Sequence, residues 1–296
     1  MRACVIFNPA AKGQKAERFR RNLDIITADC ELKLTSAAGD ARRLAASAVM
    51  DGFDTVIAAG GDGTLNEVLN GIGDTPDGFT QTRLGVLPLG TINVFARELG
   101  IPTQPEAAWP IVRQGKETTI DLPRLEFGKS ENRQFVYFAQ LAGAGLDARA
   151  IQLVSWSLKK RIGPLAYVVA GLRALTESHS SLSVSDGMTQ LSGQLVLVGN
   201  GRLYGGNFHV FPRAALTDGL LEVCVFPRVN WRVLIRCATS LLLTGKLPEK
   251  AVTRLRVKSF ELVGPSSVWT EVDGELAGPL PATFSMLPKA LRVLVP

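Results

Sequence analysis

The chain has 296 residues, a length that fits one large domain or two domains of ordinary size. Its composition is 46% hydrophobic and 20% charged, which excludes a disordered chain and a coiled coil. The formal net charge of +6 leaves phosphate-bearing substrates, anionic membranes and nucleic acids as eligible partners. No stretch reaches about 18 consecutive apolar residues, so we expect no transmembrane helix.

The cysteine and histidine content narrows the chemistry further. The four cysteines lie far apart and form no CxxC pair, which argues against a zinc site and a disulfide framework. This usage suits a reducing cytosol, and we expect a cytoplasmic protein. Two histidines are too few for chemistry that rests on a histidine cluster.

The first third of the chain alternates between short apolar strands and helical segments. The expected strands are 2–7, 31–35, 55–59 and 84–87, and the expected helices are 16–26, 40–50, 64–72 and a segment that ends near residue 99. Strands that alternate with helices predict an α/β domain with a parallel sheet and helices on both faces.

Beyond residue 120 the pattern becomes β-rich. The expected strands are 133–141, 194–200, 220–226, 254–263 and 290–295, and helical segments near 150–176 and 230–245 interrupt them. Glycine turns between the strands predict a β-sandwich. We place the boundary near residues 121–123, which gives an α/β domain over 1–122 and a β-rich domain over 123–284. The tail from about 285 to 296 can return to the first domain.

The strongest motif is a glycine turn after the third expected strand. Its residues are Gly60, Gly61, Asp62, Gly63, Thr64, Leu65 and Asn66. Glycines let backbone N–H groups approach a ligand closely, and a helix that starts behind such a turn favours phosphate. Thr64 and Glu67 have the spacing of a capping box, which predicts that the helix starts at Thr64. The run is neither a Walker loop nor a dinucleotide fingerprint. Because Asp62 would repel a bare phosphate, we expect it near a metal ion or a hydroxyl.

A second turn, residues 88–93, also follows an apolar strand and opens a helix. In a parallel sheet both turns lie at the carboxyl ends of strands, where α/β folds bind ligands. Thr91 and Asn93 are therefore candidates to contact the same nucleotide.

Two stretches are both apolar and basic. Residues 231–258 carry seven basic residues against one acid, residues 151–175 carry four against none, and each stretch has a tryptophan, Trp231 or Trp156. Such composition suits contact with anionic lipid, and an ordinary amphipathic helix with a solvated basic face is the alternative. Basic and aromatic residues do not alternate as in RNA-binding modules, so we expect no nucleic-acid partner.

Taken together, these motifs resemble the diacylglycerol kinase catalytic family, in its bacterial lipid kinase branch, which is related to sphingosine and ceramide kinases. The matching pieces occur in the family's order over nearly the whole chain: Asn8-Pro9, Thr35 before Gly39-Asp40, the two turns, Gly199-Asn200-Gly201 with Gly205-Gly206, residues 212–220, and Asp273-Gly274-Glu275. The resemblance implies ATP-dependent phosphorylation of a lipid hydroxyl. From the two basic apolar stretches we expect peripheral contact with an anionic membrane, at its inner face.

The resemblance also assigns roles to residues. Thr35, the Gly60 to Asn66 turn and Thr91 would contact ATP, and Glu275 would be the general base on the acceptor hydroxyl. Asp273 would belong to the metal or water network, although a plain β-turn is the alternative reading of that motif. A structural Mg²⁺ would be held by Ala215, Asp218 and Leu220. A second Mg²⁺ would accompany ATP, near Asp62 and Asp121.

Two departures from the family pattern leave alternatives open. Val94 stands where the family has an aspartate, and Ala11-Lys12 stand where it has Ser-Gly. An NAD kinase relative and a non-catalytic nucleotide- or lipid-binding regulator therefore remain alternatives. The acceptor lipid and the oligomeric state are open.

Overall fold

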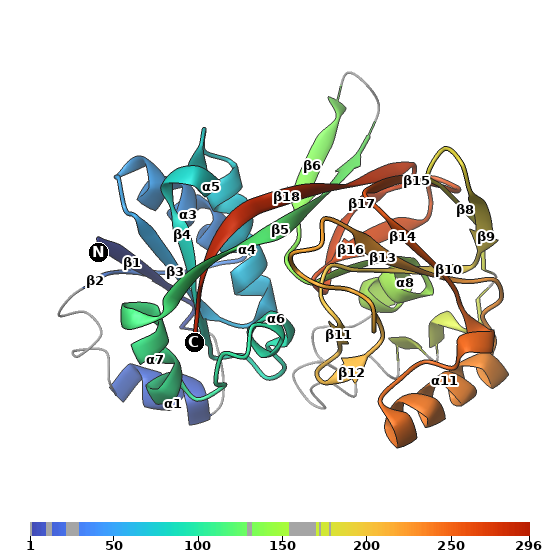
Figure 1. Cartoon of the computed structure of the whole chain (residues 1–296), viewed down its shortest axis with the longest axis horizontal. Helices are drawn as coiled ribbons and strands as arrows, with labels where there is room; N and C mark the ends of the chain where they lie inside the picture. Colours follow the sequence, from blue (N-terminus) through green and yellow to red (C-terminus); the bar gives the residue numbers. More distant parts are fainter. Residues whose placement is uncertain are drawn as a thin grey trace.

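Two large β-sheets organise the chain, and one of them runs through both halves of the molecule (Figure 1). The computed structural model describes residues 2–9, 14–21, 30–128, 132–153, 170–171, 173–177 and 179–296. The architecture is mixed α/β, with a parallel sheet in the N-terminal half and an antiparallel β-sandwich in the C-terminal half. The expected fold class is therefore confirmed. The end of the helix expected over 16–26 and most of the basic segment 151–175 lie outside the described residues.

The N-terminal half contains four neighbouring parallel strands in the order β2-β1-β3-β4. They are β1 (Ala3–Phe7), β2 (Cys30–Leu34), β3 (Thr55–Gly60) and β4 (Arg83–Pro88). The helices of this half are α1 (Gln14–Arg21), α3 (Asp40–Met50), α4 (Asp62–Gly73), α5 (Gly78–Gln81), α6 (Val94–Glu98) and α7 (Pro105–Gln114). Strands β1 and β3 are buried along their whole length, as apolar runs in a covered parallel sheet should be.

Two long strands join the halves. β5 (Lys116–Phe127) and β18 (Ala282–Val295) pair antiparallel over most of their length, with one register shift between Leu287 and Leu291. Near its end β18 also pairs with β4, at Val293 and Leu84. The boundary expected near residues 121–123 falls inside β5, so the chain passes between the halves as a continuous strand.

The C-terminal half is built from a second, antiparallel sheet of order β14-β13-β10-β7-β16-β17, which faces the extension of the first sheet. Its strands are β7 (Leu141–Gly145), β10 (Leu195–Gly199), β13 (Leu221–Phe226), β14 (Thr253–Val257), β16 (Trp269–Val272) and β17 (Glu275–Pro279). The extension contains β6 (Gln134–Tyr137), β8 (Leu182–Ser185), β9 (Gln190–Gly193) and β15 (Ser259–Val263). A buried apolar cluster with side chains from both sheets forms the core of this sandwich.

The remaining elements of this half lie outside the sandwich. They are α8 (Leu146–Leu153), the short hairpin β11 (Leu203–Tyr204) and β12 (Phe208–His209), α11 (Trp231–Thr244) and the 3-10 turn Glu249–Ala251. Among the described residues, no helix combines the length and apolar character needed to cross a bilayer.

Two expected strands are each split in the structure. Residues 133–141 form β6 and the start of β7, because the N–H groups of Ala139 and Gln140 between these strands donate to the Asp273 side chain instead of to a neighbouring strand. Residues 254–263 form β14 and β15, which belong to different sheets. A sandwich needs the chain to cross between its sheets, and local sequence does not show where that happens.

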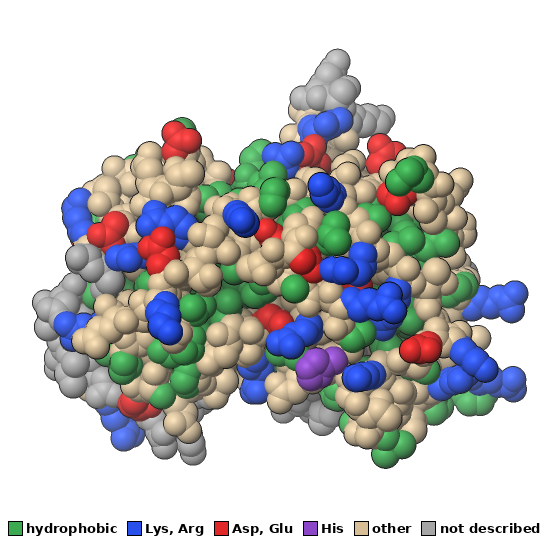
Figure 2. Space-filling model, in the orientation of Figure 1, with side chains coloured by type: hydrophobic (Ala, Val, Ile, Leu, Met, Phe, Trp, Pro, Cys, Tyr) green, Lys and Arg blue, Asp and Glu red, His purple; other side chains and the backbone are tan. Residues whose placement is uncertain are grey.

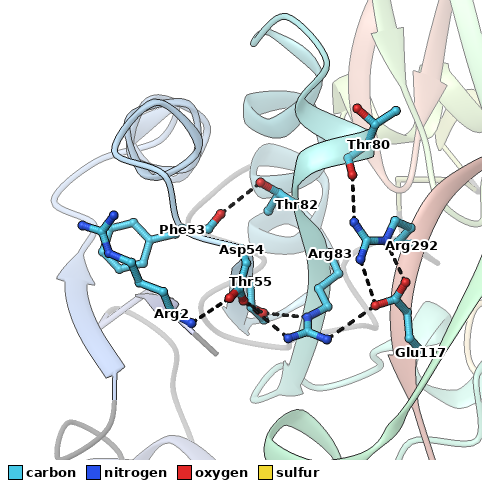
Figure 3. Close-up of polar contacts among 9 residues, drawn as sticks. All are labelled: Arg2, Phe53, Asp54, Thr55, Thr80, Thr82, Arg83, Glu117 and Arg292. Carbon is cyan, nitrogen blue, oxygen red and sulfur yellow. Dashed lines mark hydrogen bonds and ion pairs between the residues drawn. The ribbon is translucent and has the colours of Figure 1, made fainter.

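A polar clamp closes the amino-terminal edge of the parallel strands (Figure 3). Arg83 at the start of β4 contacts Thr55 and Asp54 on one side and Glu117 on the other. Glu117 also binds Arg292 of β18 through two hydrogen bonds of 2.7 and 3.0 Å. This clamp fixes β18 and β5 to the first domain at the edge opposite the glycine turns.

Candidate active site

The carboxyl ends of the four parallel strands gather the motifs predicted to bind a nucleotide. Asn8 follows β1, Thr35 follows β2, Gly60 ends β3 and Pro88 ends β4. The strand registers are continuous, since Phe7 is aligned with Leu34 and Ala59 and Gly60 with Pro88. Thr35 is buried, and its N–H donates to the Phe7 carbonyl at 3.0 Å. The structure therefore places these predicted residues along one edge of the sheet.

The two turns are in direct contact with one another. The N–H groups of Leu89 and Gly90 both donate to the Gly60 carbonyl, at 2.9 and 3.2 Å. A Cβ atom on Gly90 would lie 2.5 Å from the Gly61 Cα, so the backbones touch where side chains cannot fit. The turns therefore form one continuous backbone surface.

Asn93 shapes the second turn from within. It has a left-handed φ of 54°, its Oδ1 accepts the Gly90 N–H at 3.1 Å, and its Nδ2 donates to the Gly90 carbonyl at 2.7 Å. This side chain is buried and fully engaged in the turn. These contacts hold the turn, and the expected contact of Asn93 with a nucleotide stays a prediction. Thr91, by contrast, is exposed at the tip of the turn.

The first turn leads straight into helix α4, which starts at Asp62 with Gly61 as the N-cap. The predicted capping box is wrong, because no side chain caps this helix. Glu67 instead accepts the N–H groups of Gly39 and Ala41, at 2.9 and 3.0 Å, and so satisfies the start of the neighbouring helix α3.

The other residues of this turn contribute through their backbone. A Cβ atom on Gly60 would lie 2.4 Å from Thr64 Oγ1, so only glycine allows the chain to pass so close to the helix. Leu65 is buried in the core, and its N–H donates to the Gly61 carbonyl at 3.0 Å. Asn8 donates to Thr64 Oγ1 at 3.4 Å, which connects the end of β1 to this helix.

Asp62 connects the two turns electrostatically. Burial, and next the negative charge of Asp273, raise the pKa of the Asp62 carboxyl to about 6. Hydrogen bonds from the backbone N–H groups of Val94, Phe95 and Asn93 act in the opposite direction and favour the charged form. Val94 thus meets Asp62 through its backbone.

The turn Asp273-Gly274-Glu275 approaches the first turn from the C-terminal half. Asn66 Nδ2 donates to Asp273 Oδ2 at 3.0 Å. A Cβ atom on Gly63 would lie 3.1 Å from Glu275 Oε1, so this carboxylate lies against the glycine turn. Residues more than 200 positions apart in the sequence are therefore brought together as the family pattern implies.

The Asp273 carboxylate is itself fully engaged. Its two oxygens accept the N–H groups of Ala139, Gln140 and Leu141, at 2.7, 2.9 and 3.1 Å, in addition to the Asn66 amide. Burial raises the pKa of Asp273, and these donors partly oppose that rise. With φ of 48° the residue also makes the turn that presents Glu275. These contacts hold the turn in place, and the expected part of Asp273 in a metal or water network stays a prediction.

A buried acid that we did not predict supports the same turn. Glu271 is almost completely buried, and its Oε2 accepts the Gly274 N–H at 2.9 Å. Burial, and next the charge of Asp147, hold the pKa of Glu271 well above its usual range, and Tyr204 donates to Asp147 at 2.7 Å. The available signal was position, since Glu271 lies only two residues before Asp273 in the sequence.

The expected structural magnesium site has a different arrangement. Asp218 Oδ1 accepts the Leu220 N–H at 2.9 Å, and Asp218 Oδ2 forms an ion pair with the Arg256 guanidinium. The Ala215 carbonyl accepts the Asp218 N–H at 3.4 Å. As placed, these residues do not fit a bound Mg²⁺, because a guanidinium already neutralises the only carboxylate among them. No group of three or more His, Cys, Asp and Glu residues within the described ranges could hold a metal ion.

Asp121, the other acid expected near Mg-ATP, is used in the fold. Its two oxygens accept the N–H groups of Gly219 and Lys289, at 2.6 and 2.8 Å, and the carboxylate is buried. It thereby ties the Asp218 loop to the bulge in β18. The expected departure at Ala11-Lys12 lies outside the described residues.

Comparison with known families matches both halves of the chain. The diacylglycerol kinase catalytic domain family matches residues 2–125, and the YegS C-terminal NAD kinase beta sandwich-like domain family matches residues 140–295. A diacylglycerol kinase of Staphylococcus saprophyticus is 30% identical over 305 residues, covering 100% of this chain and 95% of the relative. A Pseudomonas aeruginosa protein named "Probable lipid kinase YegS-like" is 34% identical over 270 residues, covering 90% of this chain and 84% of the relative.

Solved structures share the fold. A diacylglycerol kinase from Bacillus anthracis str. Sterne superposes with a TM-score of 0.76 at 22% identity, covering 100% of this chain and 97% of that structure. A yeast NADH kinase in complex with NADH gives a TM-score of 0.55 at 10% identity, covering 100% of this chain and 84% of that structure. At these identities the likeness concerns the fold alone.

Proposed function

This chain belongs to the diacylglycerol kinase catalytic family and is a lipid kinase, and we propose that it transfers the γ-phosphoryl group of ATP to the hydroxyl of a lipid alcohol such as diacylglycerol. The proposal names the phosphate donor, the acceptor class and the residues that act. It also includes peripheral contact with an anionic membrane, where such acceptors reside, on the cytoplasmic face.

The observation that carries the proposal is the position of Glu275. Its carboxylate lies 3.1 Å from where a Cβ on Gly63 would be, at the surface made by the two glycine turns. A carboxylate next to a phosphate-binding turn repels phosphate, so its presence there is unfavourable for ATP binding alone and points to a function in the reaction. Accepting a proton from an attacking hydroxyl is such a function, and it requires only that the acceptor lies between the carboxylate and the γ-phosphoryl group.

The reaction then uses few protein groups. The lipid hydroxyl oxygen forms a bond to the γ-phosphorus while the bond from that phosphorus to the β,γ-bridging oxygen breaks, and ADP leaves. The hydroxyl proton passes to Glu275. Asp273 and Glu271 hold the turn that carries Glu275, through their hydrogen bonds to backbone N–H groups.

The N-terminal half holds ATP in this proposal. The joined turns present backbone N–H groups and the start of helix α4, which together favour phosphate oxygens. Thr91 at the exposed tip of the second turn and Thr35 at the end of β2 lie on the same edge of the sheet. Mg²⁺ bound with ATP would neutralise phosphate charge. Asp62 stays the acid expected near it, although its carboxylate already accepts the N–H groups of Val94, Phe95 and Asn93.

An NAD kinase-like activity is the second candidate, because the yeast NADH kinase shares this fold. The Asp273-Gly274-Glu275 turn, placed against Gly63, favours the lipid kinase. A non-catalytic regulator is the third candidate, because Val94 replaces the aspartate of the family pattern. The Asp62 carboxylate accepts the backbone N–H of Val94, and this hydrogen bond forms whatever the side chain of residue 94 is.

The test measures transfer of a radiolabelled γ-phosphate from ATP to diacylglycerol in mixed micelles. The same assay is then run against a lipid extract, and the labelled product is identified by mass. We expect saturable labelling of a lipid alcohol. NADP⁺ formation from NAD⁺ and ATP would support the NAD kinase alternative, and ATP binding without transfer to any lipid would support the regulator.

A further inference from the structure

Helix α11 carries an apolar stripe on its outer side. Trp231, Ile235 and Leu242 are 61%, 57% and 76% exposed, and Ala238 between them is also exposed. Positions i, i+4, i+7 and i+11 lie on one face of an α-helix. Leu243, 79% exposed, widens the face. Large apolar side chains that are both exposed and contiguous mark an interaction surface.

The stripe is not needed to hold the helix in place. The opposite face of α11 packs on the core through Cys237, which is buried, and through Val233, Leu234 and Leu241. Asn230 caps the helix by accepting the Val233 N–H at 3.0 Å. The helix is therefore apolar on both sides, and its outer side has no partner within the described part of the chain.

The charges around the stripe are almost all positive. Arg232 and Arg236 are exposed next to it, and the Arg232 guanidinium lies over the Trp231 ring at 5.2 Å. Lys246 and Lys250 follow the helix, and Glu249 is the one acid from residue 231 to 258. Figure 2 shows basic and apolar side chains together at the lower right, where α11 lies in Figure 1. An apolar stripe bordered by cations complements an anionic lipid surface.

Two hydrogen bonds connect this helix to the second glycine turn. The His209 N–H donates to the Gly245 carbonyl at the end of α11, at 2.8 Å, which attaches the helix to the β11-β12 hairpin. Within the loop of that hairpin, Asn207 Oδ1 accepts from Arg97 of helix α6 at 3.1 Å. Helix α6 opens directly behind the second turn. A surface that docks through α11 is thus tied by short contacts to the half that would hold ATP.

We propose that α11 is a membrane-docking helix, with Trp231, Ile235 and Leu242 inserted at the boundary of headgroups and acyl chains and Arg232 and Arg236 on anionic headgroups. The inference rests on the proposed function in one respect: docking would bring the enzyme to a lipid acceptor, which resides in a bilayer. The docking itself is measured without ATP or turnover, so the two ideas can fail separately.

The experiment is cosedimentation of the full chain with vesicles of phosphatidylglycerol and phosphatidylcholine, compared with phosphatidylcholine alone. We expect binding only to the anionic vesicles. The double variant I235S/L242S should weaken it by about 10-fold or more, as expected when two large apolar side chains no longer enter the interface. The variant R232Q/R236Q should weaken it by a similar factor and flatten its dependence on salt.

Controls separate docking from folding and from catalysis. Met188→Ser alters an exposed apolar side chain on the distant β8-β9 turn and should leave binding unchanged. All variants should phosphorylate a short-chain diacylglycerol that is dispersed as monomers at the wild-type rate. Binding of I235S/L242S equal to wild type would overturn the proposal. A second outcome would also overturn it: the wild-type chain is a dimer in sedimentation, and I235S/L242S is a monomer that still binds vesicles. The stripe would then be the contact with a second copy of the chain.

Discussion

Replacement of Asp273 by asparagine is expected to destabilise the protein although the side chain keeps its shape. The carboxylate accepts four donors: the N–H groups of Ala139, Gln140 and Leu141 and the Asn66 amide. An amide has one accepting oxygen, so in either orientation two of these donors face its NH₂ group. Each buried donor without an acceptor costs about 1–3 kcal/mol, and loss of the buried charge offsets part of the sum. We expect a net loss of about 2–4 kcal/mol in the free energy of unfolding.

The assay is urea unfolding at pH 8, followed by circular dichroism, with Asp186→Asn as the matched control. Asp186 Oδ1 alone accepts both the Met188 and the Thr189 N–H, at 2.9 and 2.6 Å, so an asparagine oxygen keeps both bonds. The control should stay within about 0.5 kcal/mol of wild type. An Asp273→Asn variant as stable as that control would refute the reasoning, because the four donors would then not depend on the charge.

Three further predictions concern the turns and the Asp218 loop. Because the pKa of Asp62 is raised to about 6 by burial and next by Asp273, its charge destabilises the fold as pH rises from about 4 to above about 6. Asp62→Asn should lack this fall, so its stability relative to wild type should rise by about 1–3 kcal/mol between pH 3 and pH 8, as measured by urea unfolding; the same difference at both pH values would contradict this. Gly90→Ala puts a Cβ 2.5 Å from Gly61 Cα, and calorimetry should show that the affinity for ATP falls by about 10-fold or more; wild-type affinity would show that the turns need not touch. With Arg256 on Asp218, removal of Mg²⁺ by a chelator should leave the wild-type Tm unchanged, whereas Arg256→Gln should lose about 1 kcal/mol and gain stability when Mg²⁺ is added; a drop of the wild-type Tm on chelation would show a structural metal site.

The parts of the fold that follow from local pattern could be predicted. The helix expected over 40–50 is α3 (Asp40–Met50), and the buried strand before the glycine turn is β3 (Thr55–Gly60). A short apolar run predicts the strand and apolar residues at helical spacing predict the helix, and neither pattern needs information from distant residues. The glycine turn could also be placed, because Gly60 has to accommodate the Thr64 side chain within the same few residues.

The rest depends on contacts between residues far apart in the sequence. Glu67 has the spacing to cap its own helix, yet it binds the start of α3, which only the packing of the two helices brings into reach. Asp218 has the residue type of a metal ligand, yet Arg256 from β14 arrives at its carboxylate. No local signal distinguishes an acid that is free to bind a ligand from one that tertiary structure has already engaged.

The most direct test compares Glu275→Gln with wild type in turnover and in ATP affinity, measured on the same preparation. Glutamine keeps the size of the side chain beside Gly63 but cannot accept the hydroxyl proton. We predict that phosphate transfer to diacylglycerol falls by about 100-fold or more while the dissociation constant for ATP changes by less than about threefold. Wild-type turnover in this variant would contradict the assignment of Glu275 as the base that completes the site.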